Sequence, residues 1–386
     1  MRSSHIARYY LDFPHFRNSH DFERIKHQAV LVKILMIGLG SIGQRHVRNL
    51  RQLLGADLEL IAYRVRRLSH VITPGMGVDA LRDVESEYDM RVYMDLDEAL
   101  GQRPAAVFIC NPNSMHVATA IACLKANCDL FIEKPVATSL DGVQELLSLA
   151  EGEFKDRIIM VGYQLRFHPC LKKLAEVIAS GALGTLLAIR CITGEYMPNW
   201  HPYEDYREAY AAKSEMGGGV ILSQIHETDY LYSLFGLPKS VFALGGHWSE
   251  LEISSEDTAS ILMEGATSAG RTLPIHLHQD FLQSPQTKQC EVIGDRGKAV
   301  MDLIATTVSV YQRDNPTPTV YEFPGFERNH LFLDQTSHFL DCIRNRHRPI
   351  VGLRDGLESV RIALAAKQSI AIGERVLLSQ IGDFRG

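Results

Sequence analysis

The chain has 386 residues, of which 46% are hydrophobic and 22% are charged, and its 40 basic and 46 acidic residues give a net charge of −6. A chain of this length predicts two domains with separate cores. The negative balance argues against nucleic acid or an anionic membrane as the main partner, and no apolar run approaches the roughly 18–20 residues needed to cross a bilayer.

The first 31 residues form a polar segment that contains acidic side chains and lacks a continuous apolar stretch. This composition argues against a secretion or transit peptide, so we expect a polar N-terminal extension over residues 1–31 of a cytoplasmic protein. The seven cysteines form no CxxC pair and no cluster with zinc spacing. They are therefore expected to be reduced structural thiols, and no metal site is predicted.

Residues 32–55 follow the order strand, glycine turn, helix. The apolar run VKILMI predicts a buried parallel strand, and GLGSIG lies between this strand and a helical pattern. In this context Gly38 permits the tight turn, Gly40 lets the backbone approach a pyrophosphate, and Gly43 lets the helix pack closely on the strand. The helix N-terminus offers free N–H groups to the phosphates. The predicted phosphate-binding residues are Gly38, Gly40, Ser41, Ile42 and Gly43.

The next predicted strand, over residues 58–64, bears on the choice of dinucleotide. A site that selects NAD usually ends this strand with an acidic residue that binds the ribose 2′-hydroxyl. Here the strand ends at Arg64, and Arg66 and Arg67 follow. Because arginines suit the 2′-phosphate, we predict NADP as the cofactor and NAD as the alternative. A solvated loop would also account for these arginines.

Strands and helices continue to alternate up to residue 160. This order predicts a Rossmann domain over residues 32–160, with a doubly wound parallel sheet that binds its ligand at the carboxyl ends of the strands. The segments NPNSMH and EKP each follow such a strand. Together with Arg64, their polar residues are expected to contact the cofactor: Asn111, Asn113, His116, Glu133 and Lys134.

Residues 161–386 are expected to form an α/β domain for substrate binding and oligomerisation. The segment 196–216 mixes aromatic and charged side chains, which suits a loop that covers a sugar, although a solvated loop has a similar composition. Farther along, HLHQDF alternates like a strand, and its histidines are expected on a sheet surface rather than in a metal site. The predicted substrate-binding residues are Arg166, Trp200, His201, Asp205, Tyr206, Arg207 and His226.

The segment GGGVILSQIHETDYL, residues 217–231, predicts a glycine turn followed by an amphipathic helix. Ser223, His226 and Tyr230 would share one face of that helix. Taken alone, a helix histidine is more often a packing or surface residue than a catalytic one. Its role therefore depends on what the rest of the chain supplies.

The ordered set of GLGSIG, NPNSMH, EKP, GYQLRFHP and the GGG segment resembles the Gfo/Idh/MocA family, named after glucose–fructose oxidoreductase, inositol dehydrogenase and a rhizopine catabolism protein. The resemblance covers residue 32 to the C-terminus. It implies an α/β fold, with an N-terminal Rossmann sheet and a C-terminal domain built on a large, open, mainly antiparallel sheet. It also implies a nicotinamide cofactor, sugar or polyol substrates, and a homodimer or homotetramer formed through the open sheet.

The resemblance further implies that Lys134 and His226 face the substrate carbinol beside the nicotinamide. We therefore predict an NAD(P)-dependent oxidoreductase acting on a secondary alcohol or ketone of a sugar, sugar acid or nucleotide-linked sugar, with an anabolic role such as polysaccharide biosynthesis. Many family members carry an aspartate one turn before the histidine, where this chain has Leu222 or Ser223. The alternative is therefore a non-catalytic NAD(P)-binding sensor or regulatory protein of the same fold.

Overall fold

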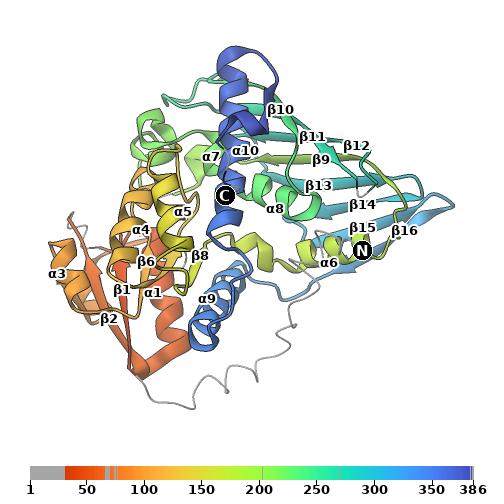
Figure 1. Ribbon diagram of the computed structural model, residues 1–386. Coiled ribbons are helices and arrows are strands. Elements are labelled where there is room, and N and C mark those ends of the chain that lie inside the picture. The colour runs from red at the N-terminus through yellow and green to blue at the C-terminus, as the bar shows by residue number, and fades with distance from the viewer. Residues whose placement is uncertain are drawn as a thin grey trace.

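The structure is a computed structural model that describes residues 31–65, 70–73, 75, 77–201, 203–267, 269–382 and 384. Residues 1–30 of the predicted extension, and Arg66 and Arg67, lie outside the described residues. Two sheets form two domains that lie side by side (Figure 1). In the described residues, no helix combines the length and the hydropathy needed to cross a bilayer.

The first domain is built on a six-stranded sheet in the order β5-β2-β1-β6-β7-β8, and all of its pairings are parallel. Its central strands are apolar runs buried on both faces, as a parallel sheet covered by helices requires. The strand order reverses at β1, which creates the crevice where such sheets bind ligands. The strands are β1 (Val32–Ile37), β2 (Leu58–Tyr63), β5 (Met90–Tyr93), β6 (Ala106–Ile109), β7 (Asp129–Ile132) and β8 (Ile159–Val161).

The helices of this domain confirm the predicted alternation, with differences at their ends. α5 begins only at Val143, because Ser139 and Asp141 hydrogen-bond to each other in a turn that ends in left-handed Gly142. The sequence pattern gave no sign of a small hairpin between β2 and α2. The additional elements are α1 (Ser41–Leu54), β3 (His70–Ile72), β4 (Val78–Asp83), α2 (Val84–Glu87), α3 (Leu96–Gly101), α4 (His116–Lys125) and α5 (Val143–Glu151).

The second domain contains a nine-stranded sheet in the order β16-β15-β14-β13-β9-β12-β11-β10-β17. All of its neighbours are antiparallel except β9 and β12, so the predicted large, mainly antiparallel sheet is confirmed. The predicted boundary after residue 160 falls inside β8, so the first sheet extends to Val161. The strands are β9 (Leu186–Gly194), β10 (Ser240–Gly246), β11 (Thr258–Ala266), β12 (Thr272–Asp280), β13 (Thr287–Gly294), β14 (Gly297–Asp302), β15 (Thr307–Gln312), β16 (Asn315–Glu322) and β17 (Val376–Leu377).

Helices cover the face of this sheet that is turned toward the first domain (Figure 1). The opposite face is open: Leu244 is 57% exposed and Leu262 is 50% exposed. His276 and His278 lie on the open face, where both ring systems hydrogen-bond to Ser260. The helices are α6 (Pro169–Ala179), α7 (Val220–Ser223), α8 (Ile225–Phe235) and α10 (Leu353–Ile372), while α9 (Arg328–Asn345) packs against α1.

All seven cysteines are buried and unpaired, as the sequence predicts. They pack as small apolar groups within the two cores.

Candidate functional site

The glycine turn after β1 leaves space next to the first turn of α1. Gly38 has φ +93°, and a Cβ there would lie 2.4 Å from the Cys110 carbonyl oxygen, while one at Gly43 would lie 2.1 Å from the Gly38 carbonyl oxygen. These two positions accept only glycine. A Cβ at Gly40 would meet nothing within 4 Å. The N-terminus of α1 has no side-chain cap, so its N–H groups and this open space fit a pyrophosphate.

Two alanine substitutions are expected to separate folding from cofactor binding at this turn. Gly40→Ala adds a methyl group in open space, so the melting temperature without cofactor stays unchanged while dinucleotide affinity falls about tenfold or more, a loss of roughly 1.4 kcal/mol. Gly38→Ala creates a backbone clash, so it lowers the melting temperature itself. Calorimetry and titration of both variants check this, and equal effects on melting would contradict it.

The segment after β6 holds two polar atoms that have no partner. Asn111 Oδ1 and Asn113 Nδ2 are buried and without a hydrogen bond in the described part of the chain, although Asn111 Nδ2 donates to Thr119 Oγ1 at 2.9 Å. Buried polar atoms normally find partners. Because these lie at the carboxyl end of a central strand, beside the glycine turn, they are suited to hold part of a dinucleotide.

His116, a predicted cofactor contact, has both ring nitrogens engaged by backbone carbonyl groups. Its ring is fully buried, Nδ1 lies 2.7 Å from the Pro135 carbonyl oxygen, and Nε2 lies 2.9 Å from the Asn111 carbonyl oxygen. Burial lowers the pKa of His116. The ring therefore joins the loop after β6 to the loop after β7, and it acts on the site by positioning those loops.

Glu133, another predicted cofactor contact, is also engaged within the protein. Its carboxylate is 2.7 Å from His46 Nε2 on α1 and accepts from the Lys134 backbone N–H at 3.1 Å, and the residue is only 6% exposed. Glu133 thus holds the start of the Lys134 loop against α1. The cis peptide bond between Lys134 and Pro135 follows directly.

Arg64 is engaged within the protein. Its guanidinium is 3.0 Å from the Glu85 carboxylate, and the residue is 5% exposed. An arginine already paired with a carboxylate is a poor partner for a 2′-phosphate. Arg64 is the member of the predicted arginine cluster that lies within the described residues. It forms an ion pair inside the protein.

Lys134 and the His226 helix meet across the two domains. Lys134 extends from the loop after β7, and its Nζ donates to the Ser223 carbonyl oxygen at 2.9 Å. Ser223 ends α7, and His226 lies in the first turn of α8. The Ser223 hydroxyl is buried without a partner in the described chain. Residues distant in the sequence thus form one polar centre at the carboxyl end of the first sheet.

The predicted single helix after the glycine turn is broken at Gln224. Its amide donates to the Asp280 carbonyl oxygen at 3.0 Å, and its own carbonyl accepts from the Gln279 amide at 2.6 Å. These bonds replace the regular helical ladder between α7 and α8. The break separates Ser223, which ends α7, from His226 and Tyr230, which stay four residues apart in α8, and the Tyr230 hydroxyl lies 2.8 Å from Cys191 Sγ in the sheet.

His226 is a neutral ring held by the segment that follows β8. The Gln164 amide lies 3.0 Å from its Nε2, and the Tyr163 ring packs edge-on at 5.8 Å. Burial and then the charges of Lys134 and Lys288 hold the pKa of His226 well below its usual value. With Nε2 accepting from Gln164, the single ring proton is on Nδ1. His226 is therefore suited to hydrogen bonding as a neutral ring.

Arg166, a predicted substrate-binding residue, is engaged in the protein interior. It is completely buried, and its guanidinium makes two hydrogen bonds to the Asp229 carboxylate, at 2.6 and 2.8 Å. Ser359 also donates to Asp229, at 3.0 Å. The sequence places this arginine at the end of the last Rossmann strand, but the packing of α8 turns it inward.

The predicted substrate loop is present, and its charges pair among themselves. Arg207 bonds Asp205 at 2.6 Å and Glu252 at 2.9 Å, and His201 bonds Glu204 at 2.7 Å. Trp200 packs edge-on against Phe281 at 4.9 Å, and the Tyr206 hydroxyl accepts from the Glu252 N–H at 3.3 Å. In the described residues no hydrogen bond or ion pair joins Asp205, Tyr206 or Arg207 to Lys134 or His226, so their substrate contacts remain predictions.

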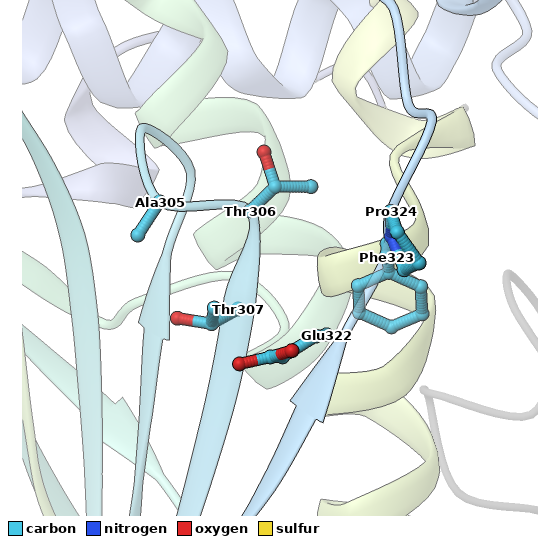
Figure 2. Close-up of a pocket in the computed structure, with 6 residues that line it drawn as sticks. All are labelled: Ala305, Thr306, Thr307, Glu322, Phe323 and Pro324. Carbon is cyan, nitrogen blue, oxygen red and sulfur yellow. The ribbon is translucent and has the colours of Figure 1, made fainter.

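Two shallow hollows, of about 200 and 210 Å³, lie on the surface of the second domain near the turn between β14 and β15. Figure 2 shows the first, whose polar groups are two threonines and one carboxylate. Neither contains a residue predicted from the sequence. The first is lined by Ala305, Thr306, Thr307, Glu322, Phe323 and Pro324, and the second by Gln286, Thr287, Lys288, Gln289, Asp302, Ile304 and Ala305.

Sequence reasoning missed Gln164, Lys288 and Glu227. Gln164 lies inside the motif GYQLRFHP, and only its contact with His226 reveals a role. Glu227 follows His226 directly and is 3% exposed, although its type favours the surface. In the sequence, the position of this carboxylate directly after a candidate catalytic residue was the only indication that it could matter.

Comparison with known proteins gives matches over both domains. Residues 32–163 match the oxidoreductase family with an NAD-binding Rossmann fold, and residues 171–300 match the GFO/IDH/MocA C-terminal domain. Myo-inositol 2-dehydrogenase of Thermotoga maritima is 26% identical over 360 residues, which cover 91% of this chain and 99% of that protein.

Solved structures share the fold. The WlbA dehydrogenase from Bordetella pertussis, in complex with NADH and UDP-GlcNAcA, has a TM-score of 0.72 and 20% identity over 90% of this chain and 98% of its own. Levoglucosan dehydrogenase in complex with NADH and levoglucosan has a TM-score of 0.73 and 16% identity over 90% of this chain and 99% of its own.

Proposed function

Because the chain belongs to the Gfo/Idh/MocA oxidoreductase family, we propose that it transfers a hydride between a nicotinamide dinucleotide and a secondary alcohol, or the corresponding ketone, of a polyol, sugar, sugar acid or nucleotide-linked sugar. The family relationship makes the protein an oxidoreductase acting on CH–OH groups. One observation carries the proposal: Lys134 Nζ reaches the Ser223 carbonyl oxygen, at 2.9 Å, one turn before His226.

The chemistry divides between the two residues. Oxidation of an alcohol requires the hydroxyl proton to leave as the hydride leaves, so a proton acceptor must be within hydrogen-bond reach. Lys134 takes this proton in oxidation and returns it in reduction, and neutral His226 holds the substrate oxygen in place. The dinucleotide accepts or supplies the hydride. Gly40, the first turn of α1, Asn111 and Asn113 would hold it.

The choice between NADP and NAD remains a prediction. Arg64 is occupied by Glu85. The homologues include solved NADH complexes. We still predict NADP, because two further arginines follow Arg64 in the sequence. Mass spectrometry of the nucleotide released from the denatured protein distinguishes NADP from NAD.

The decisive test is hydride transfer. Purified protein with NAD or NADP and a panel containing myo-inositol, levoglucosan and UDP-GlcNAcA should change absorbance at the nicotinamide band with at least one substrate. Dinucleotide binding without transfer to any member of the panel contradicts the proposal and favours the regulatory alternative.

We also propose assembly into a homodimer or homotetramer through the open face of the nine-stranded sheet. Leu244 and Leu262 expose apolar surface there in the free chain. Leu262→Glu is expected to convert the oligomer to monomer in light scattering. Leu81→Glu is the matched control, because Leu81 is 98% exposed in the first domain. An unchanged mass for Leu262→Glu contradicts the assigned surface.

A further inference from the structure

His46 is a completely buried histidine on the helix that starts at the glycine turn. It lies in the second turn of α1, and its exposed fraction is 0%. Three phenylalanine rings, from β6, β7 and α9, pack around its imidazole, with centroid distances of 5.3 Å to Phe108, 4.9 Å to Phe131 and 6.3 Å to Phe332. An imidazole enclosed in this way acts on a neighbour within the protein.

That neighbour is Glu133, which directly follows β7. His46 Nε2 lies 2.7 Å from Oε1 of the Glu133 carboxylate. The other ring nitrogen, Nδ1, is buried and has no hydrogen-bond partner in the described part of the chain. Because a proton on Nδ1 would be buried without an acceptor, the ring proton is on Nε2 and is donated to Glu133. The helix of the glycine turn therefore holds this carboxylate directly.

The second carboxylate oxygen of Glu133 holds Lys134. Oε2 accepts from the Lys134 backbone N–H at 3.1 Å, and Lys134 Nζ donates to the Ser223 carbonyl oxygen at 2.9 Å. The carboxylate thus fixes the backbone from which the lysine side chain extends, and the Ser223 carbonyl fixes its end. A displaced Glu133 carboxylate would displace the Lys134 backbone with it.

The same carboxylate lies against the segment that holds His226. A Cβ at Gly162 would lie 3.2 Å from Glu133 Oε1 and 3.3 Å from Oε2. The two residues after Gly162 both contact His226. The Tyr163 ring packs edge-on at 5.8 Å, and the Gln164 amide lies 3.0 Å from Nε2. Glu133 therefore touches both segments that position the candidate catalytic residues.

We propose that His46 is a positioning residue for hydride transfer, which through Glu133 aligns Lys134 and His226 with a dinucleotide bound at the N-terminus of α1. The first turn of this helix offers its N–H groups to the pyrophosphate, and its second turn holds Glu133. One rigid element thus locates the cofactor and both candidate catalytic residues. Binding of the dinucleotide should therefore also steady the Lys134 segment. This inference rests on the proposed function.

The first test compares single-turnover hydride transfer in wild type, His46→Leu and His46→Gln, with a substrate that the wild-type protein oxidises. Leucine is apolar and cannot donate to Glu133, so the rate should fall about 10²-fold, the effect of a misplacement of about 1 Å. The glutamine amide nitrogen is as many bonds from Cβ as histidine Nε2, so His46→Gln should react within about threefold of wild type. Dinucleotide affinity should be retained in both variants, because the glycine turn is unchanged. A glutamine variant as slow as the leucine variant overturns the role of the donated hydrogen bond.

A second variant keeps every hydrogen-bonding group and tests the alignment even if His46→Leu does not fold. The Gly162 backbone is not left-handed, so alanine can adopt it, and its methyl group would push the Glu133 carboxylate by a few tenths of an ångström. Gly162→Ala should therefore slow hydride transfer about tenfold and retain dinucleotide affinity. Gly101→Ala in α3 is the matched control, because a Cβ there meets nothing within 4 Å. Equal rates in the two alanine variants contradict the alignment.

Hydrogen exchange followed by mass spectrometry gives a readout that needs no turnover. Addition of NADP or NAD should slow exchange in the peptide that contains the Lys134 N–H in wild type and in His46→Gln, but not in His46→Leu. No slowing in wild type, or equal slowing in all three proteins, overturns the coupling through His46. A wild type that binds dinucleotide without turnover overturns the proposed function instead, and the exchange measurement still decides whether His46 couples the two sites.

Discussion

Replacing Lys134 with methionine is expected to lower the rate of hydride transfer by about 10²- to 10⁴-fold, the contribution of a positioned proton-transfer group. Methionine keeps most of the length and the apolar stem of lysine, but it cannot accept or donate a proton. Lys134 is itself a predicted cofactor contact, but the glycine turn and Asn111, which would hold the dinucleotide, do not involve its ammonium. Dinucleotide affinity should therefore change by less than about threefold.

Single-turnover measurements at the nicotinamide band separate the chemical step from product release. Lys125→Met serves as the control, because Lys125 forms an exposed ion pair with Glu145 on the surface of the first domain. This variant should react at the wild-type rate. If Lys134→Met also transfers hydride within about threefold of wild type, another group handles the proton and the proposed mechanism is wrong.

The second large effect is expected on stability, when the buried ion pair between Arg166 and Asp229 is broken. Both side chains are buried, with exposures of 0% and 1%. Arg166→Leu or Asp229→Leu leaves one charge buried without its partner, so each single variant should lose about 3–5 kcal/mol of free energy of unfolding. The double variant, which leaves no charge, should regain most of this loss.

Urea unfolding followed by circular dichroism measures these changes. The matched control is Arg207→Leu, because Arg207 pairs with Asp205 at the surface, where the two side chains are 48% and 42% exposed. That change should cost less than about 1 kcal/mol. Losses that simply add in the double variant would show that the two side chains do not act as a buried pair.

Local patterns predicted the first domain well, because its elements are determined by short-range requirements. A buried parallel strand needs an apolar run, and the turn after β1 needs glycine, since any side chain at Gly38 or Gly43 would collide with a backbone carbonyl. The cap of α3 is equally local: the Asp95 carboxylate accepts from the Glu98 N–H at 2.9 Å. The β3–β4 hairpin was missed.

Polar residues within the motifs were predicted less well, because a side chain at a strand end can turn toward a ligand or toward the interior. His116 and Glu133 lie in the predicted segments, but both turn inward, to backbone carbonyls and to His46. Arg64 and Arg166 find carboxylates on other elements. Neither spacing nor composition reveals such partners.

The sequence by itself determined the Rossmann class of the first domain and the open glycine turn, since these depend on residue type and local conformation. Its resemblance to a known family made Lys134 and His226 candidates. Only the tertiary structure decided that Lys134 meets the helix of His226, that this helix breaks at Gln224, and that Glu227 is buried beside it. The physical reason is that these contacts join residues far apart in the chain. Which polar group is desolvated, and which finds a partner, depends on how the two domains pack.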